Sequence, residues 1–251
     1  MNIISLINQK GGVGKTTSTA NIGAALAELN KGVLLIDLDP HANLSYSLGI
    51  QAHELESSVY ELLKGEADLS GVLQHRGALD IIPASLDLAA LDMELSGKIG
   101  RENQLKRVLK DLKNYDFILI DCPPSLGLLT INALTFSNKV FIVTQPEYLA
   151  LKGMNKLLDT LEEIRDMELN TAIDLAGIVF TMYDSRKNLN REIIDKVTKH
   201  FGRLVFDTYI RSNVSLAEAP AQGKTIFEYK PCSRGAEDYL RLTTEILERM
   251  K

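Results

Sequence analysis

Seven short segments of the chain are rich in apolar residues, and more polar stretches separate them. The segments cover residues 2–8, 32–39, 79–84, 117–122, 139–145, 175–183 and 203–210. Most are apolar almost without interruption, which is typical of strands that helices cover on both faces. The alternation of these strands with helical stretches predicts an α/β fold, a doubly wound and mostly parallel sheet with helices on both faces.

The stretches between the strands carry apolar residues at helical spacing. The first contains Ile22, Leu26 and Leu29 on one face and is expected to end at Gly32. Similar patterns predict helices over 101–114, 151–167, 189–201 and 235–251. No repeat or linker divides the chain, so we expect a single domain over residues 1–251.

Composition narrows the class of protein. The 251 residues are 45% apolar and 24% charged, and the longest apolar runs are far shorter than the ~20 residues of a membrane span. No signal peptide is evident, and two isolated cysteines, Cys122 and Cys232, suggest reduced thiols. These features predict a soluble, cytoplasmic protein.

Charge is unevenly distributed along the chain. The net charge is −5, yet residues 186–234 contain ten basic and five acidic residues. That segment therefore carries +5, and the rest of the chain carries −10. The asymmetry allows a basic surface on an acidic protein.

The segment KGGVGKTT, residues 10–17, follows the first strand and begins a helix, which is the context of a phosphate-binding loop. Glycines let backbone N–H groups turn towards an anion, Lys15 would neutralise phosphate charge, and the Thr16 hydroxyl would bind Mg²⁺. The usual first glycine of such a loop is replaced by Gln9, and a second cation, Lys10, is added. The residues expected to contact the nucleotide are Gly11, Gly12, Val13, Gly14, Lys15, Thr16 and Thr17.

Three aspartates follow strands and are candidates for chemistry beside this loop. Asp39 is expected to orient an attacking water and to help bind Mg²⁺, although a turn or helix-capping role is the alternative. Asp37, two residues earlier, would hold Lys10 or Lys15, or stabilise the strand end. Asp121 ends the apolar run FILID and is expected to bind Mg²⁺ directly or through a water, so the predicted metal ligands are Thr16, Asp39 and Asp121.

Together these motifs resemble a known family. The segments KGGVGKTT, IDLDPHANLS, FILIDCPPSLG, NVSLAEAP and YKPCSRGAEDYL are similar to those of the deviant-Walker-A ATPases, most closely the ParA/Soj-type chromosome- and plasmid-partitioning ATPases. The resemblance runs from Ile3 to about Leu240. It also implies the short form that lacks an N-terminal helix-turn-helix domain.

The resemblance implies a mechanism. ATP and Mg²⁺ would bring two subunits together as a sandwich homodimer in which Lys10 reaches the partner's nucleotide, so that Lys10, Lys15 and Asp39 are the expected catalytic residues. The dimer would bind double-stranded DNA without sequence preference at the nucleoid, and a ParB-type centromere-binding protein would stimulate slow hydrolysis. The candidate DNA-binding residues are Arg186, Lys199, Arg203, Arg211, Lys224 and Arg234.

Two departures from the family pattern concern the nucleotide site. The family often has Pro-Gln-Gly-Asn after the second aspartate, where this chain has PHAN, Pro40 to Asn43, and His41 is expected to be a tolerated surface residue. The family commonly has Pro-Arg-Asn near the adenine, where this chain has Arg211, Ser212 and Asn213. Adenine contacts through Arg211 are therefore disfavoured, and contacts are expected from Asn213 and from the backbone after FTMYD. Met182, within that segment, is also an expected nucleotide-binding residue.

Three other functions fit parts of this pattern. A MinD-like membrane-positioning ATPase would need a basic amphipathic C-terminal helix, which the mixed charges of RLTTEILERMK disfavour. An electron-transfer or metal-delivery ATPase would need cysteine ligands at suitable spacing, and Cys122 and Cys232 do not supply them. A catalytically silent scaffold is disfavoured by the intact Lys15, Thr16, Asp39 and Asp121.

Overall fold

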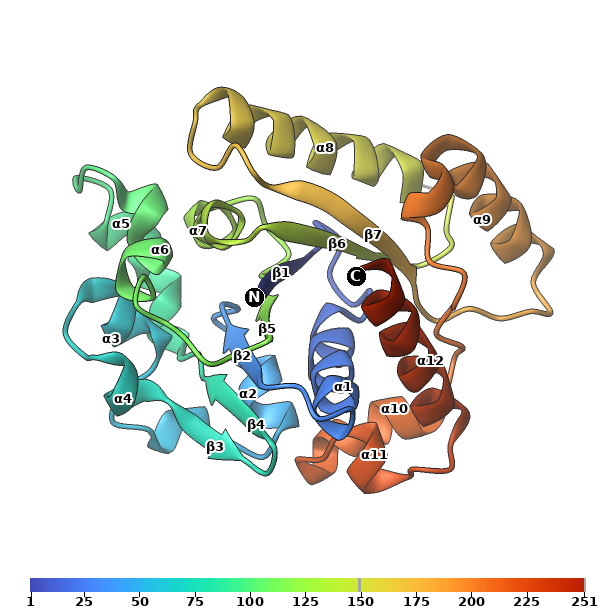
Figure 1. Cartoon of the computed structure of the whole chain (residues 1–251), viewed down its shortest axis with the longest axis horizontal. Helices are drawn as coiled ribbons and strands as arrows, with labels where there is room; N and C mark the ends of the chain where they lie inside the picture. The colour runs from blue at the N-terminus through green and yellow to red at the C-terminus, as the bar shows by residue number, and fades with distance from the viewer. Residues whose placement is uncertain (149, 251) are drawn as a thin grey trace.

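The carboxyl ends of six parallel strands meet at one edge of a central sheet (Figure 1). The computed structural model describes residues 1–148 and 150–250. Within them the strand order is β3-β4-β2-β5-β1-β6-β7, with only the edge strand β3 antiparallel. The strands are β1 (Asn2–Ile7), β2 (Val33–Asp37), β3 (Gln74–Arg76), β4 (Leu79–Ile82), β5 (Phe117–Asp121), β6 (Lys139–Thr144) and β7 (Asp174–Phe180).

Helices cover both faces of this sheet, which confirms the predicted doubly wound α/β fold (Figure 1). Along β2 the side chains alternate, so that Leu34 and Ile36 pack in one core and Val33 and Leu35 in the other. The helices are α1 (Lys15–Glu28), α2 (Asn43–Ser47), α3 (Val59–Lys64), α4 (Leu69–Val72), α5 (Leu91–Glu94), α6 (Gln104–Val108), α7 (Leu128–Phe136), α8 (Ala150–Asp166), α9 (Asn188–Phe201), α10 (Val214–Glu218), α11 (Ile226–Tyr229) and α12 (Arg234–Arg249). Short 3-10 helices connect several of them.

The prediction of a strand over 203–210 is wrong. The 3-10 helix η4 (Gly202–Leu204) begins this segment, and the rest runs beside β7 with two isolated pairings, Ile178 with Val205 and Tyr183 with Arg211. Its apolar residues pack against the sheet instead of pairing with it as a strand. The Phe206 ring packs over Gly177 of β7 and contacts the Phe141 ring edge-on, with 5.3 Å between the ring centroids.

Two other local predictions also differ from the structure. The helix expected over 101–114 is only a 3-10 helix, η3 (Arg101–Asn103), followed by α6, because the chain must turn back to enter β5 and Asn114 adopts φ +76°. The polar strand β3 was not predicted, since its three residues show no apolar alternation. The helices predicted over 151–167, 189–201 and 235–251 correspond to α8, α9 and α12.

We expect Gly177→Ala to destabilise the protein by about 1–3 kcal/mol, because the new Cβ would lie 2.1 Å from Cε2 of the buried Phe206 ring. Gly153→Ala is the matched control: Gly153 lies inside α8, and its added Cβ meets nothing within 4 Å. That variant should be more stable than the parent by up to ~1 kcal/mol. Urea unfolding of both variants checks this expectation, and equal stabilities would contradict it.

Candidate nucleotide-binding and catalytic site

The loop between β1 and α1 forms a turn that exposes backbone N–H groups at the start of a long helix. Gly12 and Gly14 adopt φ +72° and +91°, a left-handed conformation that glycine reaches without strain. The N-cap residue of α1 is Gly14, which has no side chain to cap the first turn, so the N–H groups of that turn can bind an anion. The Thr181 hydroxyl donates to the Val13 carbonyl at 2.6 Å and anchors the loop to the end of β7.

Thr16 and Asp121, predicted from separate motifs, meet in the structure. The Thr16 hydroxyl donates to Oδ2 of Asp121 at 2.6 Å, while the buried Oδ1 of Asp121 has no hydrogen-bond partner among the described residues. Burial, with a contribution from the nearby Asp37, raises the pKa of Asp121 to about 8. A buried carboxylate with an unused oxygen beside a hydroxyl is a chemically suitable partial site for a hard cation such as Mg²⁺.

Asp37 lies beside Asp121 in the sheet register but has a different set of partners. Its carboxylate accepts hydrogen bonds from the backbone and hydroxyl of Ser45, at 2.9 and 2.8 Å, and from the Asp39 backbone at 3.2 Å. Burial raises the pKa of Asp37 to about 6. Of the roles considered for Asp37, the structure supports stabilisation of the strand end, where it ties α2 to β2.

Asp39 lies just beyond β2 with its side chain only 10% exposed. Its Oδ1 accepts hydrogen bonds from the His41 backbone at 3.0 Å and is 2.8 Å from the His41 Nδ1 atom. The residue lines the same cavity as the phosphate-binding loop. The sequence analysis expected His41 to be a tolerated surface residue. Its side chain is indeed exposed, but the contact with Asp39 was not predicted.

The two lysines of the loop lie in different environments. Lys15 is buried, and its Nζ donates to the Asn8 carbonyl at 3.2 Å, within the loop itself. The Lys10 side chain is 54% exposed, and its Nζ pairs with Glu147, which follows β6, at 2.5 Å. Lys15 therefore lines the cavity over the loop, while Lys10 lines a different cavity together with Glu147.

A cavity of about 480 Å³ lies over the loop and brings most of the predicted nucleotide-binding residues together. Met182, in a left-handed conformation with φ +51°, also lines it. Asn213 instead caps α10 by accepting a hydrogen bond from the Ser215 backbone at 2.9 Å. The other lining residues include five that the sequence analysis did not identify: Asn21, Ser47, Pro124, Ala219 and Pro220.

Asn21 connects the loop helix to the C-terminal region. Its amide donates to the Thr17 carbonyl at 2.8 Å, and its side-chain oxygen accepts from the Ile226 backbone at 2.8 Å. No local pattern marks this contact, because its partners are 205 residues apart.

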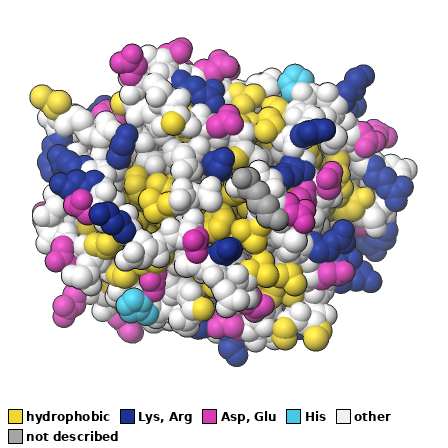
Figure 2. Space-filling view, in the orientation of Figure 1, with side chains coloured by type: hydrophobic (Ala, Val, Ile, Leu, Met, Phe, Trp, Pro, Cys, Tyr) yellow, Lys and Arg dark blue, Asp and Glu magenta, His cyan; other side chains and the backbone are white. Residues whose placement is uncertain are grey.

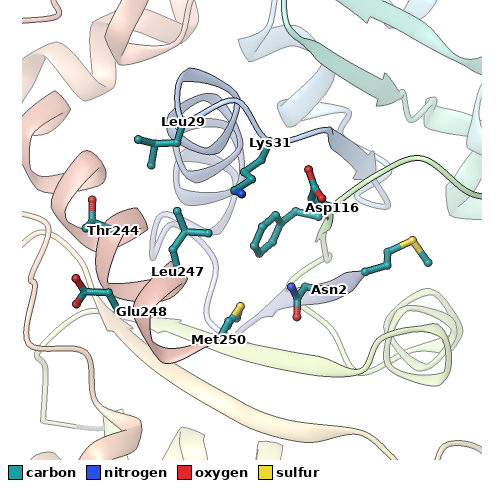
Figure 3. Close-up of a pocket in the computed structure, with 10 residues that line it drawn as sticks. Asn2, Leu29, Lys31, Asp116, Thr244, Leu247, Glu248 and Met250 are labelled. Carbon is teal, nitrogen blue, oxygen red and sulfur yellow. The ribbon is translucent and has the colours of Figure 1, made fainter.

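A second cavity of about 480 Å³ lies at the amino-terminal edge of β1 and β5, where both chain ends contribute residues (Figure 3). Leu29, Leu247 and Met250 line it together with the charged Lys31, Asp116 and Glu248. No glycine-rich loop or helix N-terminus opens into it. The chemistry of the lining therefore places the candidate nucleotide site at the other edge of the sheet.

The candidate DNA-binding residues fall into three groups. Arg186 and Arg211 are engaged by carboxylates, Arg186 by Asp184 and Arg211 by Asp238 and Glu237, and these contacts raise the pKa of Arg211. Lys224 lines the nucleotide cavity. Lys199, Arg203 and Arg234 are exposed and form no ion pair within residues 1–148 and 150–250.

Figure 2 shows Lys and Arg side chains gathered at the right of the view, where Figure 1 places α9. Residues 188–203 include exposed basic side chains, among them Lys199 and Arg203. A positive surface over α9 is thus available to a polyanion.

Comparisons with known proteins extend over the whole chain. Residues 1–175 match the family described as AAA domain, and residues 110–251 match the family described as 4Fe-4S iron sulfur cluster binding proteins, NifH/frxC family. The chain is 49% identical over 247 residues to the sporulation initiation inhibitor protein Soj of Bacillus subtilis (strain 168), and 97% of each chain is covered. It is 48% identical over 246 residues to the chromosome-partitioning ATPase Soj of Treponema pallidum (strain Nichols), covering 97% of this chain and 96% of the relative.

Solved structures share the same fold. A structure described as cobyrinic acid a,c-diamide synthase from Mycobacterium smegmatis with bound ATP analog and magnesium has a TM-score of 0.90 and 35% sequence identity, over 100% of this chain and 96% of that chain. The cell division ATPase MinD of Pyrococcus furiosus has a TM-score of 0.81 and 29% identity, over 98% of each chain.

We expect the magnesium-free protein to lose stability as pH rises from about 4 to about 8. Because the folded-state pKa of Asp121 is raised, the folded protein binds more protons than the unfolded chain in this window, so the free energy of unfolding falls with pH. Asp121→Asn should remove part of this dependence, with a gain at pH 8 on the order of a few kcal/mol. Urea unfolding with a chelator at several pH values checks this, and identical pH profiles of parent and variant would contradict it.

Proposed function

This chain belongs to the ParA/Soj family of chromosome-partitioning ATPases, and on that premise we propose that it binds ATP and Mg²⁺ at the cavity over residues 10–17 and couples ATP hydrolysis to DNA partitioning. The observation that carries the proposal is the contact between Thr16 and the buried Asp121 below an uncapped helix N-terminus. That arrangement supplies an anion site and a cation site side by side.

The residues of the cavity, together with the buried Asp121 that Thr16 contacts, fit both ligands. The N–H groups of the glycine loop and Lys15 would contact the phosphates, and Thr16 and the unpartnered Oδ1 of Asp121 would hold the cation. No group of three or more His, Cys, Asp or Glu side chains with metal-binding geometry lies within the described residues. The cation site would therefore be completed by phosphate oxygens and water, and bound Mg²⁺ would neutralise charge on the phosphates.

Asp39 is the candidate for orienting the attacking water. Its carboxylate lines the cavity and is nearly buried, as a hydrogen-bond acceptor for a water near a γ-phosphate should be. In the reaction, the water oxygen attacks the γ-phosphorus, the bond from that phosphorus to the β–γ bridging oxygen breaks, and ADP and phosphate leave.

Lys10 is the candidate for completing the partner's site in an ATP-dependent homodimer. Its exposed side chain is consistent with reaching a second subunit. The contact with Glu147 is solvent-exposed, so it contributes at most about 1 kcal/mol and would be exchanged readily for phosphate oxygens. A cation delivered in trans would stabilise charge on the transferring phosphoryl group.

DNA binding is proposed for the exposed basic residues on and after α9. Lys199 and Arg203 are free to contact phosphates, and a homodimer would present two copies of this surface. Binding of this kind depends on charge rather than on base identity. A ParB-type protein bound at its centromere would then stimulate a slow hydrolysis and release the dimer from DNA.

The MinD-like alternative predicts membrane attachment through a C-terminal amphipathic helix. In the structure the apolar face of α12 is buried, with Tyr239, Leu242 and Ile246 packed in the core that α1 shares. No helix in the described part of the chain is both long and apolar enough to cross a membrane. The buried face of α12 favours the DNA-partitioning function over this alternative.

Cys122 is a candidate iron ligand to consider, because residues 110–251 match a family of iron–sulfur proteins. It is buried at the end of β5, and burial raises its pKa, which disfavours the thiolate that an iron ligand requires.

The proposed function predicts that the protein binds nonspecific duplex DNA with ATP but not without it, and that the affinity falls steeply between about 50 and 200 mM salt. Lys199→Glu with Arg203→Glu removes two contacts from each subunit of the homodimer, so it should lower the salt slope by about 3–4 and leave ATPase activity in place. Lys31 lies at the opposite edge of the sheet (Figure 3), and Lys31→Glu is the charge-matched control for the single variant Lys199→Glu.

Fluorescence anisotropy with labelled duplex, alongside phosphate release, measures both quantities. ATP-independent DNA binding would contradict the proposal. Binding to anionic vesicles without affinity for DNA would favour the membrane alternative instead.

Alanine variants of Lys15 and Lys10 should lose different activities. Lys15→Ala should abolish nucleotide binding, whereas Lys10→Ala should retain it and lose both dimerisation and hydrolysis. Glu147→Gln should retain dimerisation, tightened by no more than about 5-fold, because an exposed ion pair is weak. Analytical ultracentrifugation with a slowly hydrolysed ATP analogue tests this, and a Lys10→Ala protein that dimerises and hydrolyses ATP normally would show that the lysine does not act in trans.

A further inference from the structure

His41 contacts Asp39 with two groups at once. The backbone N–H of His41 donates to Asp39 Oδ1 at 3.0 Å, and the ring Nδ1 lies 2.8 Å from the same oxygen. Since the ionised carboxylate only accepts hydrogen bonds, the ring nitrogen acts as the donor. Within the described residues Oδ2 of Asp39 accepts no hydrogen bond, so this oxygen remains available to the cavity.

The backbone turn that contains His41 is fixed by hydrogen bonds on both sides. Ala42 donates to the Asp39 carbonyl at 2.8 Å and adopts φ +52°, which an alanine takes up only under some strain. Immediately afterwards α2 begins, and Ser45 fixes that helix to the buried Asp37. The turn from Asp39 to Ala42 is thus bound at both ends, and the ring cannot leave the carboxylate by a simple shift of the backbone.

The side chains of Asp39 and His41 differ in how much of each is exposed to solvent. The Asp39 side chain is 10% exposed and the His41 side chain 74% exposed, and both residues line the nucleotide cavity. A carboxylate that can rotate about its last side-chain bond loses part of its ability to orient a water, and a second donor on one oxygen removes that freedom.

We propose that His41 is a positioning residue for Asp39. Resting on the proposed ATPase function, the proposal is that the imidazole fixes Oδ1 so that Oδ2 accepts the hydrogen bond of the water that attacks the γ-phosphorus. His41 touches neither the water nor the phosphate in this role. It acts on the rate of hydrolysis and not on the binding of the nucleotide.

Three substitutions separate this role from a structural one. In His41→Asn the amide nitrogen lies as many bonds from Cα as Nδ1 does, so the donor is retained. In His41→Leu the side chain branches as that of Asn does but has no donor, and in His41→Ala the donor is also absent. We expect kcat to fall by about 10-fold in the Ala and Leu variants and by less than about 3-fold in the Asn variant, with KM for ATP, ADP affinity and Tm close to the parent values.

A double-mutant cycle with Asp39 completes the test. If His41 acts through Asp39, His41→Ala should cause no further loss of kcat when Asp39→Ala is already present. Parent-like kcat in His41→Ala, an Asn variant as slow as the Ala variant at unchanged Tm, or additive losses in the cycle would each overturn the proposal. If His41→Ala does not fold, the comparison of the Asn and Leu variants, which have the same shape with and without the donor, decides the question in the same way.

The experiments distinguish a failure of the proposed positioning role of His41 from a failure of the proposed ATPase function. A parent protein that shows no ATP hydrolysis would refute the proposed function itself. A parent that hydrolyses ATP, together with an unchanged His41→Ala variant, would refute only the positioning role.

Discussion

The buried carboxylates at the ends of β2 and β5 are the constraint on which the site depends. Asp37 and Asp121 are direct neighbours in the parallel register, and Asp39 follows two residues later. Buried negative charge without partners is costly, so each carboxylate must be compensated by donors or by a cation. Asp37 is compensated by Ser45 and Asp39 by His41, which leaves Asp121 with a single donor, Thr16. Asp121 is therefore the least compensated of the three carboxyl groups, and burial raises its pKa; a cation beside the glycine loop would favour its ionised form.

The features that the sequence predicted well are those written in local patterns. Continuous apolar runs identified six of the strands, and because parallel strands present their carboxyl ends at one edge, Asp37 and Asp121 were expected near the loop of residues 10–17. The segment 203–210 shows where this reasoning fails. Its apolar residues cover the edge of β7 through Phe206 on Gly177, and a run of apolar residues does not distinguish a covering segment from a paired strand.

The features that could not be predicted depend on contacts between distant segments. The positive count over residues 186–234 overstates the free charge, because Asp184, Glu237 and Asp238, which pair with Arg186 and Arg211, lie just outside that range. Lys224 likewise lines the nucleotide cavity, a position that follows from the packing of the C-terminal segment on α1 through Asn21. Linear charge patterns report composition, whereas free charge depends on tertiary pairing.

The contrast between Lys15 and Lys10 bears on why the loop has two cations. Lys15 is buried and its ammonium group is already directed at the loop backbone, so little side-chain entropy remains to be lost when it binds phosphate. Lys10 is half exposed, and its ion pair with Glu147 is weak because water screens both charges. A lysine that binds the phosphates of its own subunit is best placed in a buried position, as Lys15 is. Lys10 is not in such a position. Its exposed position instead suits a phosphate that belongs to a second subunit. The ion pair with Glu147 is weak, so Lys10 can exchange it for such a phosphate at little cost.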